Sequence, residues 1–236
     1  VASDLPGIDI LLNKQAIIIN RDNKTSNGYV HHIDHVLDPI TDNIYDVLAS
    51  YDGYDIFKQG LDLAGLSDTL KVIEFPFGTT TVRTRYTLLA VPDTLYNRAG
   101  INSIDDLIDL YDVEKTYELT DSKNGFFQYM EYHCLSGTHY FSDFEPDGIY
   151  YLITADNYLN IKVEEDYKIN KDAEGYTGFY FDQSNIPAKN GAIHTVTTTL
   201  PNTDTDLATV RFEVTHFFDM MQGPYYLNYY ERFYDG

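Results

Sequence analysis

The stretch that decides the fold is Asn190-Gly-Ala-Ile-His-Thr-Val-Thr-Thr-Thr-Leu-Pro201. The Asn-Gly pair is typical of a turn, and the β-branched residues after it favour an extended strand. Pro201 has no backbone N–H group and would stop that strand. We therefore predict a turn that leads into one long strand over residues 190–200.

A near-copy of this stretch occurs 163 positions earlier (190 against 27), as Asn27-Gly-Tyr-Val-His-His-Ile-Asp-His-Val-Leu37. That distance is too long for a solenoid period and suits the ends of two successive domains. The positions that carry the echo are Asn27, Gly28 and His31 in the first copy and Asn190, Gly191, Ile193 and His194 in the second.

Composition limits the classes of function. The chain has 236 residues, enough for one large or two small domains, and 43% of them are hydrophobic, which allows a proper core. The formal net charge is −21, so no cationic field attracts nucleic acid or an anionic membrane surface. No apolar run approaches the roughly 20 residues of a membrane helix. The single cysteine, Cys134, rules out an internal disulfide framework.

The periodicity of apolar residues predicts a mixed order of elements. Asp93 is expected to cap a helix that follows an apolar run buried on both faces. The predicted helices are 44–49, capped within 41–43, 54–65, ended by Gly65, 66–70, one after Asp93, 104–111, capped by Ser103, and Ser122 to His133, ended by Gly137. The predicted strands are 8–12, 16–20, 27–37, a β-rich stretch over 71–91, 148–154, 158–163, 176–181, 190–200 and 208–214.

The order of these parts resembles that of a fasciclin-type (FAS1) domain. Four pieces carry the resemblance, and motifs in order are more specific than any one alone. They are the opening helices 44–49 and 60–70, the signature Thr87-Leu-Leu-Ala-Val-Pro-Asp-Thr-Leu-Tyr96, the Tyr132-His133 pair with Gly137 and Ser142-Asp143, and the closing strand 190–200. Leu89 stands where the family has an aromatic residue, and Val91-Pro92 where it has Pro-Thr.

The resemblance implies an α+β fold, a FAS1-like antiparallel β-sandwich or wedge with a cluster of helices on one side. It divides the chain into three parts. Residues 1–40 would hold the closing strands of a preceding FAS1-like unit and a linker, 41–201 a complete domain, and 202–236 an extension with a strand and a tyrosine-rich tail. It also implies a hydrogen bond between Asp93 and His133, with Tyr132 in or near the core.

Histidine, cysteine and aspartate each admit a structural and a chemical interpretation. His194 and His31 are interpreted as histidines bonded to nearby backbone, with a zinc ligand as the alternative; His31 and His35 share a strand face but lie roughly 13 Å apart. Cys134 beside His133 is interpreted as a small buried hydrophobe and not as a protease nucleophile. Asn202-x-Asp204-x-Asp206 has calcium-like spacing but lacks the glycine and distal glutamate of a full loop. We predict no cofactor and no metal.

These patterns predict a non-enzymatic adhesion or scaffold module outside the cytoplasm, of a bacterial cell-surface type, with room for a lipid anchor upstream. Its partner would be a protein or a glycan. The alternative is a carbohydrate-binding component of a bacterial surface uptake system, which exposed coplanar tyrosine or phenylalanine rings would favour. A hydrolase would need converging carboxylates with perturbed pKa values.

Overall fold

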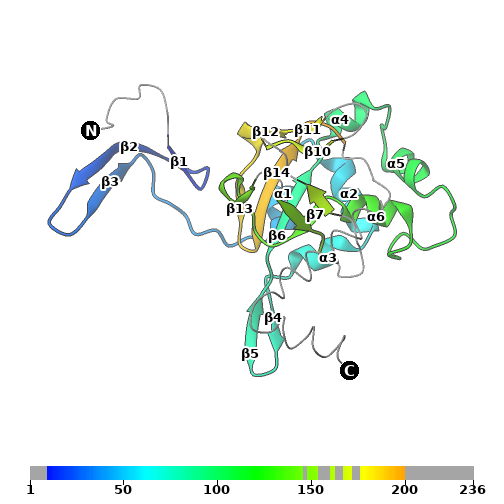
Figure 1. Ribbon diagram of the computed structural model, residues 1–236, viewed down its shortest axis with the longest axis horizontal. Helices are drawn as coiled ribbons and strands as arrows, with labels where there is room; N and C mark the ends of the chain where they lie inside the picture. Colours follow the sequence, from blue (N-terminus) through cyan, green and yellow to red (C-terminus); the bar gives the residue numbers. More distant parts are fainter. Residues whose placement is uncertain (1–9, 146–147, 154–159, 163–166, 172–175, 200–236) are drawn as a thin grey trace, which may run out of the picture.

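A computed structural model describes residues 10–145, 148–153, 160–162, 167–171 and 176–199 (Figure 1). The predicted strand at 208–214, the calcium-like Asp204 and Asp206, and the tyrosine-rich tail lie outside these residues. The chain begins with an arm that projects from a larger body built around one central sheet.

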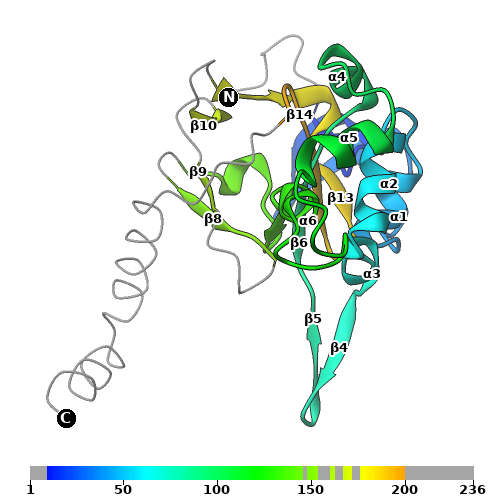
Figure 2. The ribbon, with the colours of Figure 1, turned by 90° about the vertical axis from the view of Figure 1, so that its right-hand side faces the viewer.

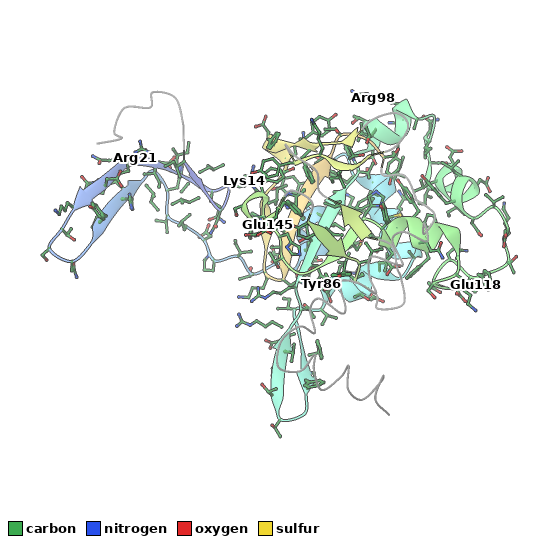
Figure 3. The ribbon with its side chains drawn as sticks, viewed as in Figure 1. Lys14, Arg21, Tyr86, Arg98, Glu118 and Glu145 are labelled. Atoms are coloured by element: carbon green, nitrogen blue, oxygen red, sulfur yellow. The ribbon has the colours of Figure 1, made fainter. Side chains whose placement is uncertain are left out.

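The arm is a three-stranded antiparallel sheet in the order β1-β2-β3. Its strands are β1 (Leu11–Leu12), β2 (Ala16–Lys24) and β3 (Tyr29–Ile33). Asn13 and Lys14 take left-handed φ values of 51° and 60°, which form the tight turn between β1 and β2. Lys14 lies where the arm approaches the body (Figure 3), and its Nζ donates a hydrogen bond to the carbonyl oxygen of Asp182 at 3.1 Å.

Three short helices open the body, where the sequence predicts them. They are α1 (Ile44–Ala49), α2 (Asp55–Leu63) and α3 (Leu66–Lys71). The Asn43 side chain accepts from the backbone N–H of Asp46 and so caps α1. Gly65 separates α2 from α3 with a φ of 72°, a conformation that glycine adopts without strain.

A projecting hairpin and then the central strand follow. β4 (Glu74–Phe77) and β5 (Thr80–Arg83) form a two-stranded antiparallel hairpin that extends away from the body (Figures 1 and 2). β6 (Tyr86–Ala90) then enters the body, and its last four residues are buried. The predicted strand buried on both faces is therefore present.

The later helices differ from the prediction at several of their ends. α4 (Asp93–Arg98) has Asp93 as its first residue and not as its cap, whereas α5 (Ile104–Tyr111) starts as predicted, with a capping box between Ser103 and Asp106. α6 (Gly125–Glu131) starts at the Asn124 cap and not at Ser122. The prediction of a helix through His133 to Gly137 is wrong, because β7 (Cys134–Ser136) pairs with β6. The His133 carbonyl accepts from Leu89 N at 2.8 Å, a sheet bond that replaces continuation of the helix.

The rest of the described chain is mostly strand. A 3₁₀ turn, η3 (Phe181–Gln183), separates β12 from β13, and another, η1 (Phe141–Asp143), follows β7. The strands are β8 (Ile149–Tyr151), β9 (Asn160–Lys162), β10 (Ile169–Lys171), β11 (Tyr176–Thr177), β12 (Phe179–Tyr180), β13 (Ile186–Ala188) and β14 (Gly191–Val196).

β14 is shorter than the long strand predicted up to Leu200. Its ladder ends where Thr197 N donates to the Gly178 carbonyl at 3.0 Å and the Thr197 hydroxyl accepts from Gly178 N at 2.9 Å. This closed pair of bonds uses a threonine side chain in place of the next ladder bond. β14 therefore stops before Pro201 for a reason other than the proline.

The central sheet has the order β12-β14-β6-β7, and β13 also pairs with β14. β14 and β6 run parallel, with Ile193 opposite Leu88, whereas the other pairs are antiparallel. Figure 2 shows α1 to α5 on one side of β14 and β6, and β8 and β10 on the other. The fold is α+β, as predicted, with helices clustered on one side of the sheet.

Candidate functional site

The Asn190 side chain ties three distant parts of the body together. Its Nδ2 donates to the carbonyl oxygens of Leu70 and Val72, both at 2.8 Å, and its Oδ1 accepts from Ile44 N at 2.8 Å. The end of α3, the start of α1 and the start of β14 thus meet at one buried amide. The carbonyl oxygen of Asn190 also accepts from Tyr86 N at 2.9 Å. We refer to this set of four bonds as the Asn190 clasp.

Gly191 is required because two backbones approach each other at this point. A Cβ at position 191 would overlap the Tyr86 carbonyl oxygen and contact the Ile44 side chain. Only glycine leaves room for β14 to lie beside β6. The Asn-Gly pair that opens the strand is therefore a packing feature as much as a turn.

His194 is a buried, fully bonded histidine. Its Nδ1 accepts from Asn185 N at 3.3 Å, so Nε2 carries the proton and donates to the His139 carbonyl oxygen at 2.8 Å. Burial lowers the pKa of His194 to about 4, and the ring stays neutral at pH 7. Phe141, Phe144 and Phe179 surround it at centroid distances of 4.9 to 5.5 Å. Both ring nitrogens are hydrogen-bonded to backbone groups, so the ring joins β14 to the segments around Asn185 and His139.

The Tyr132–Cys134 segment is buried in the core. His133 Nδ1 donates to the Tyr129 carbonyl at 2.8 Å, and burial lowers the pKa of His133 to about 4. Its Nε2 has no hydrogen-bond partner. Burial raises the pKa of the Cys134 thiol, which donates to the Met130 carbonyl. A neutral thiol without a base beside it is not a nucleophile.

The hydrogen bond expected between Asp93 and His133 does not form. The Asp93 carboxylate accepts instead from Asp55 N and Ile56 N, both at 2.9 Å, at the start of α2. Asp93 is also the first residue of α4, with Pro92 at the cap position, so it does not cap its own helix as predicted. Because Tyr54, the residue at the cap position of α2, offers no side-chain cap, Asp93 supplies that cap from another helix.

The arm and the closing strands of the body share one hydrogen-bonded geometry. His31 Nδ1 accepts from Asp22 N at 3.2 Å, as His194 Nδ1 does from Asn185 N. Asp22 and Asn185 have left-handed φ values of 61° and 56°. Each histidine thus accepts from an Asx residue nine positions before it, in the same unusual backbone conformation.

The strand registers match as well. Val30 lies opposite Asn23 and Tyr29 opposite Lys24, at the same 163-residue offset as Ile193 opposite Ile186 and Ala192 opposite Pro187.

At the far end, Asp34 repeats the bonds of Thr197. Asp34 N donates to the Ile17 carbonyl at 3.1 Å, and the Asp34 carboxylate accepts from Ile17 N at 2.6 Å. The bond from Ile17 N lowers the pKa of the Asp34 carboxyl. The segment from Gly178 to Asn185 in the body, which contains η3, is two residues longer than the matching segment from Ile17 to Asp22 in the arm.

What surrounds the two copies is different. A Cβ at Gly28 would meet nothing within 4 Å, whereas at Gly191 it would overlap β6. Asn27 Oδ1 accepts only from the nearby Thr25 hydroxyl at 3.3 Å, among the bonds found in the described residues. β3 thus has the geometry of β14, but among the described residues no strand takes the place of β6 beside it.

The β4–β5 hairpin presents an apolar face that sequence reasoning did not single out. All eight residues of its strands are exposed, and Phe77 is 66% exposed. Phe75 lies opposite Val82, two positions from Phe77, so the three side chains share one face. The signal in the sequence is the alternation Phe75-Pro-Phe77-Gly78, followed by Thr80-Thr-Val82.

The partly exposed aromatic rings of the body meet at angles. Phe141 lies 5.2 Å from Tyr167 with the ring planes at 38°, and 5.1 Å from Phe181 at 63°. Tyr167 and Phe181 are at 81° to each other. A sugar ring stacks on a flat aromatic platform, and this group does not supply one.

The described residues contain neither a metal cluster nor a membrane-spanning helix. No group of three or more His, Cys, Asp or Glu side chains there is placed to hold a metal ion. His35 pairs with Asp34 at 2.9 Å and lies beyond the end of β3, so it does not share a strand face with His31. No helix in the described part is long and apolar enough to span a membrane.

Comparison with known proteins gives a likeness in structure. No family model matches the chain, and no curated protein matches it. Among solved structures, it is similar to a FAS1 domain pair from the insect cell adhesion molecule fasciclin I, with 20% sequence identity and a TM-score of 0.48. The match covers 79% of this chain and 60% of that one. The chain thus spans less than two thirds of the structure that it resembles.

Proposed function

We propose that this chain is a non-enzymatic adhesion or scaffold module that works outside the cytoplasm and binds a protein partner. We also propose that it is a fasciclin-like domain. The order of the sequence motifs supports this assignment. So do their positions, because the predicted closing strand pairs with β6 and the buried Tyr132-His133 pair directly precedes β7 of the same sheet.

The burial of the candidate histidines and of the cysteine in the body supports a non-enzymatic role. His133, His194 and Cys134, the body residues that the sequence offered as candidate ligand, base or nucleophile, are all buried. Their backbone bonds and shifted pKa values hold them neutral at pH 7. General acid–base catalysis needs a group with a pKa near the working pH that reaches a substrate. These three groups satisfy neither condition.

The observation that carries the proposal is the apolar face of the β4–β5 hairpin. An isolated two-stranded hairpin is marginal in water, and exposed phenylalanine side chains gain free energy when a partner covers them. Aromatic side chains are also common energetic centres of protein interfaces. Phe75, Phe77 and Val82 therefore form the surface that we assign to a protein partner.

An adhesion assay with matched variants tests this proposal. The full chain, immobilised on a surface, is expected to retain cells of its source, or matrix protein from their surface. Adhesion by the double variant F75S/F77S is expected to be at least 10-fold weaker than adhesion by the wild type. The control T81A changes the opposite face of the hairpin and is expected to adhere normally. Equal adhesion by F75S/F77S and the wild type would contradict the role of the hairpin.

A glycan array separates the alternative. Strong binding to defined glycans without protein adhesion would favour a carbohydrate-binding component of an uptake system. Turnover of any arrayed glycan would overturn the non-enzymatic assignment.

A further inference from the structure

We propose that the outer edge of β3 is a docking site for a parallel, apolar β-strand presented by another domain of the same fold, one that lacks its own closing strands. This proposal rests on the fold and is independent of the adhesive function proposed above. The arm would then do for that domain what β14 does for this body.

The first argument is that β3 matches β14 in detail but pairs with no strand on its outer side in the part of the chain that the structure describes. The histidine bond, the left-handed Asx residue, the strand register and the terminal bond pair all recur. In the body, the side of β14 that faces away from β13 pairs in parallel with β6, from Gly191 to Thr195. The corresponding side of β3 is the edge of the three-stranded sheet.

The second argument is that the residues at the outer edge of β3 leave room and hydrogen-bonding groups for the backbone of a docked strand. Gly28 leaves the space that Gly191 uses for the Tyr86 carbonyl. The Asn27 amide lacks the long-range bonds of the Asn190 clasp, which on a docked domain would be two carbonyl oxygens and one N–H group. Tyr29 is 63% exposed and Val30 46% exposed, whereas Ala192 and Ile193 at the same places in the body are buried.

The third argument concerns which domain docks. Residues 10–38 contain three basic residues and three Asp or Glu residues, so they are neutral in a chain of net charge −21. A neutral arm approaches an acidic domain of this kind without the repulsion that its own body would meet. A second copy of this chain does not fit, because the fully buried Ala192 would have to be replaced by Tyr29.

A tethered strand tests the docking edge on the full chain. Residues 84–92, which contain β6, are fused ahead of Val1 through a Gly/Ser linker of about 20 residues, which spans roughly 25 Å on average. Such a tether gives the strand an effective concentration of about a millimolar. Hydrogen exchange is then measured at the β3 amides that do not bond to β2. The fusion is expected to slow exchange there at least 10-fold.

The variant G28A is the sharp control. An added Cβ at position 28 meets nothing in the isolated chain, so exchange elsewhere in the arm is expected to stay unchanged. In the fusion the same Cβ would meet the docked backbone and is expected to abolish the added protection. A scrambled tethered strand is expected to give none.

Three results would overturn the proposal. They are no added protection in the fusion, protection that persists with G28A, and a concentration-dependent dimer of the unfused chain that protects the same β3 amides. The last result would show that β3 pairs with its own copy. None of these measurements depends on adhesion, so failure here leaves the proposed function untouched.

Discussion

A single amide side chain holds the ends of the body together. Asn190 satisfies two carbonyl groups and one N–H group that belong to segments more than a hundred residues away in the sequence. Buried backbone groups need such partners, because water cannot reach them. The importance of this asparagine therefore comes from what it joins and not from any reaction.

Replacing Asn190 with alanine is expected to lower the free energy of unfolding by about 3 to 5 kcal/mol, because three buried backbone groups lose their partner. The matched control is N27A, in the exposed copy, which is expected to change it by less than about 0.5 kcal/mol. Urea denaturation followed by circular dichroism measures both. A loss below about 1 kcal/mol for N190A would show that the clasp is not a stabilising contact.

The two buried histidines make stability dependent on pH. In the folded chain the pKa of His133 and that of His194 are about 4, against 6.5 for an ordinary histidine. Between pH 6.5 and 4 these histidines bind protons in the unfolded chain but not in the folded chain. Stability that is present above pH 6.5 is therefore lost as the pH falls toward 4. The loss is about 1.4 kcal/mol per pH unit for each histidine.

Urea midpoints between pH 6.5 and 5 measure this loss while the carboxylates are still charged. The variant H133L is expected to show about half of the wild-type slope, since one of the two histidines no longer titrates. An unchanged slope in H133L would mean that His133 does not remain neutral in the folded chain.

At the scale of elements, one carboxylate joins two helices. Asp93 starts α4 and caps α2, so the turn after β6 fixes where α2 begins. We expect D93A to cost about 1 to 2 kcal/mol of stability, the usual loss for an N-cap residue. D105A, an exposed acid in the first turn of α5, should cost only a few tenths of a kcal/mol. Equal losses would remove the capping role of Asp93.

Local patterns predicted most elements, and long-range pairing accounts for the errors. The caps at Asn43 and Ser103 and the buried run at β6 follow from neighbouring residues. The helix end near Cys134 was wrong because pairing with β6 outweighs a continued helical pattern. Asp93 was misassigned for the same reason, since its true partners lie 37 and 38 residues away.

The site was harder to predict than the fold. The 163-residue echo located Asn190 and His194, but their partners at Leu70, Val72 and His139 carry no sequence signal, because any residue offers a backbone carbonyl. The match of Asp22 with Asn185 could have been found, as each is an Asx residue nine positions before its histidine.

On the scale of the whole molecule, the β4–β5 hairpin is separable from the body. Thr84 N donates to the Ile73 carbonyl at 2.9 Å and closes the base of the hairpin, and every strand residue beyond that bond is exposed. Replacing residues 74–83 with Asn-Gly, a natural hairpin turn, is expected to change the free energy of unfolding by less than about 0.5 kcal/mol. The same variant should lose adhesion. A larger loss of stability would show that the hairpin contributes to the stability of the body.

The parallel pairing of β6 with β14 has a consequence for synthesis on the ribosome. β6 is made early and its final partner late, because the strands are separated by more than a hundred residues. At roughly 5 to 20 residues per second, the apolar strand Tyr86–Ala90 waits on the order of 5 to 20 seconds for β14. During that interval only β7 can cover one of its edges. The nascent chain therefore exposes the unpaired, apolar edge of β6, which is prone to aggregation. The yield of folded protein in a cell should depend on chaperones that bind extended apolar segments.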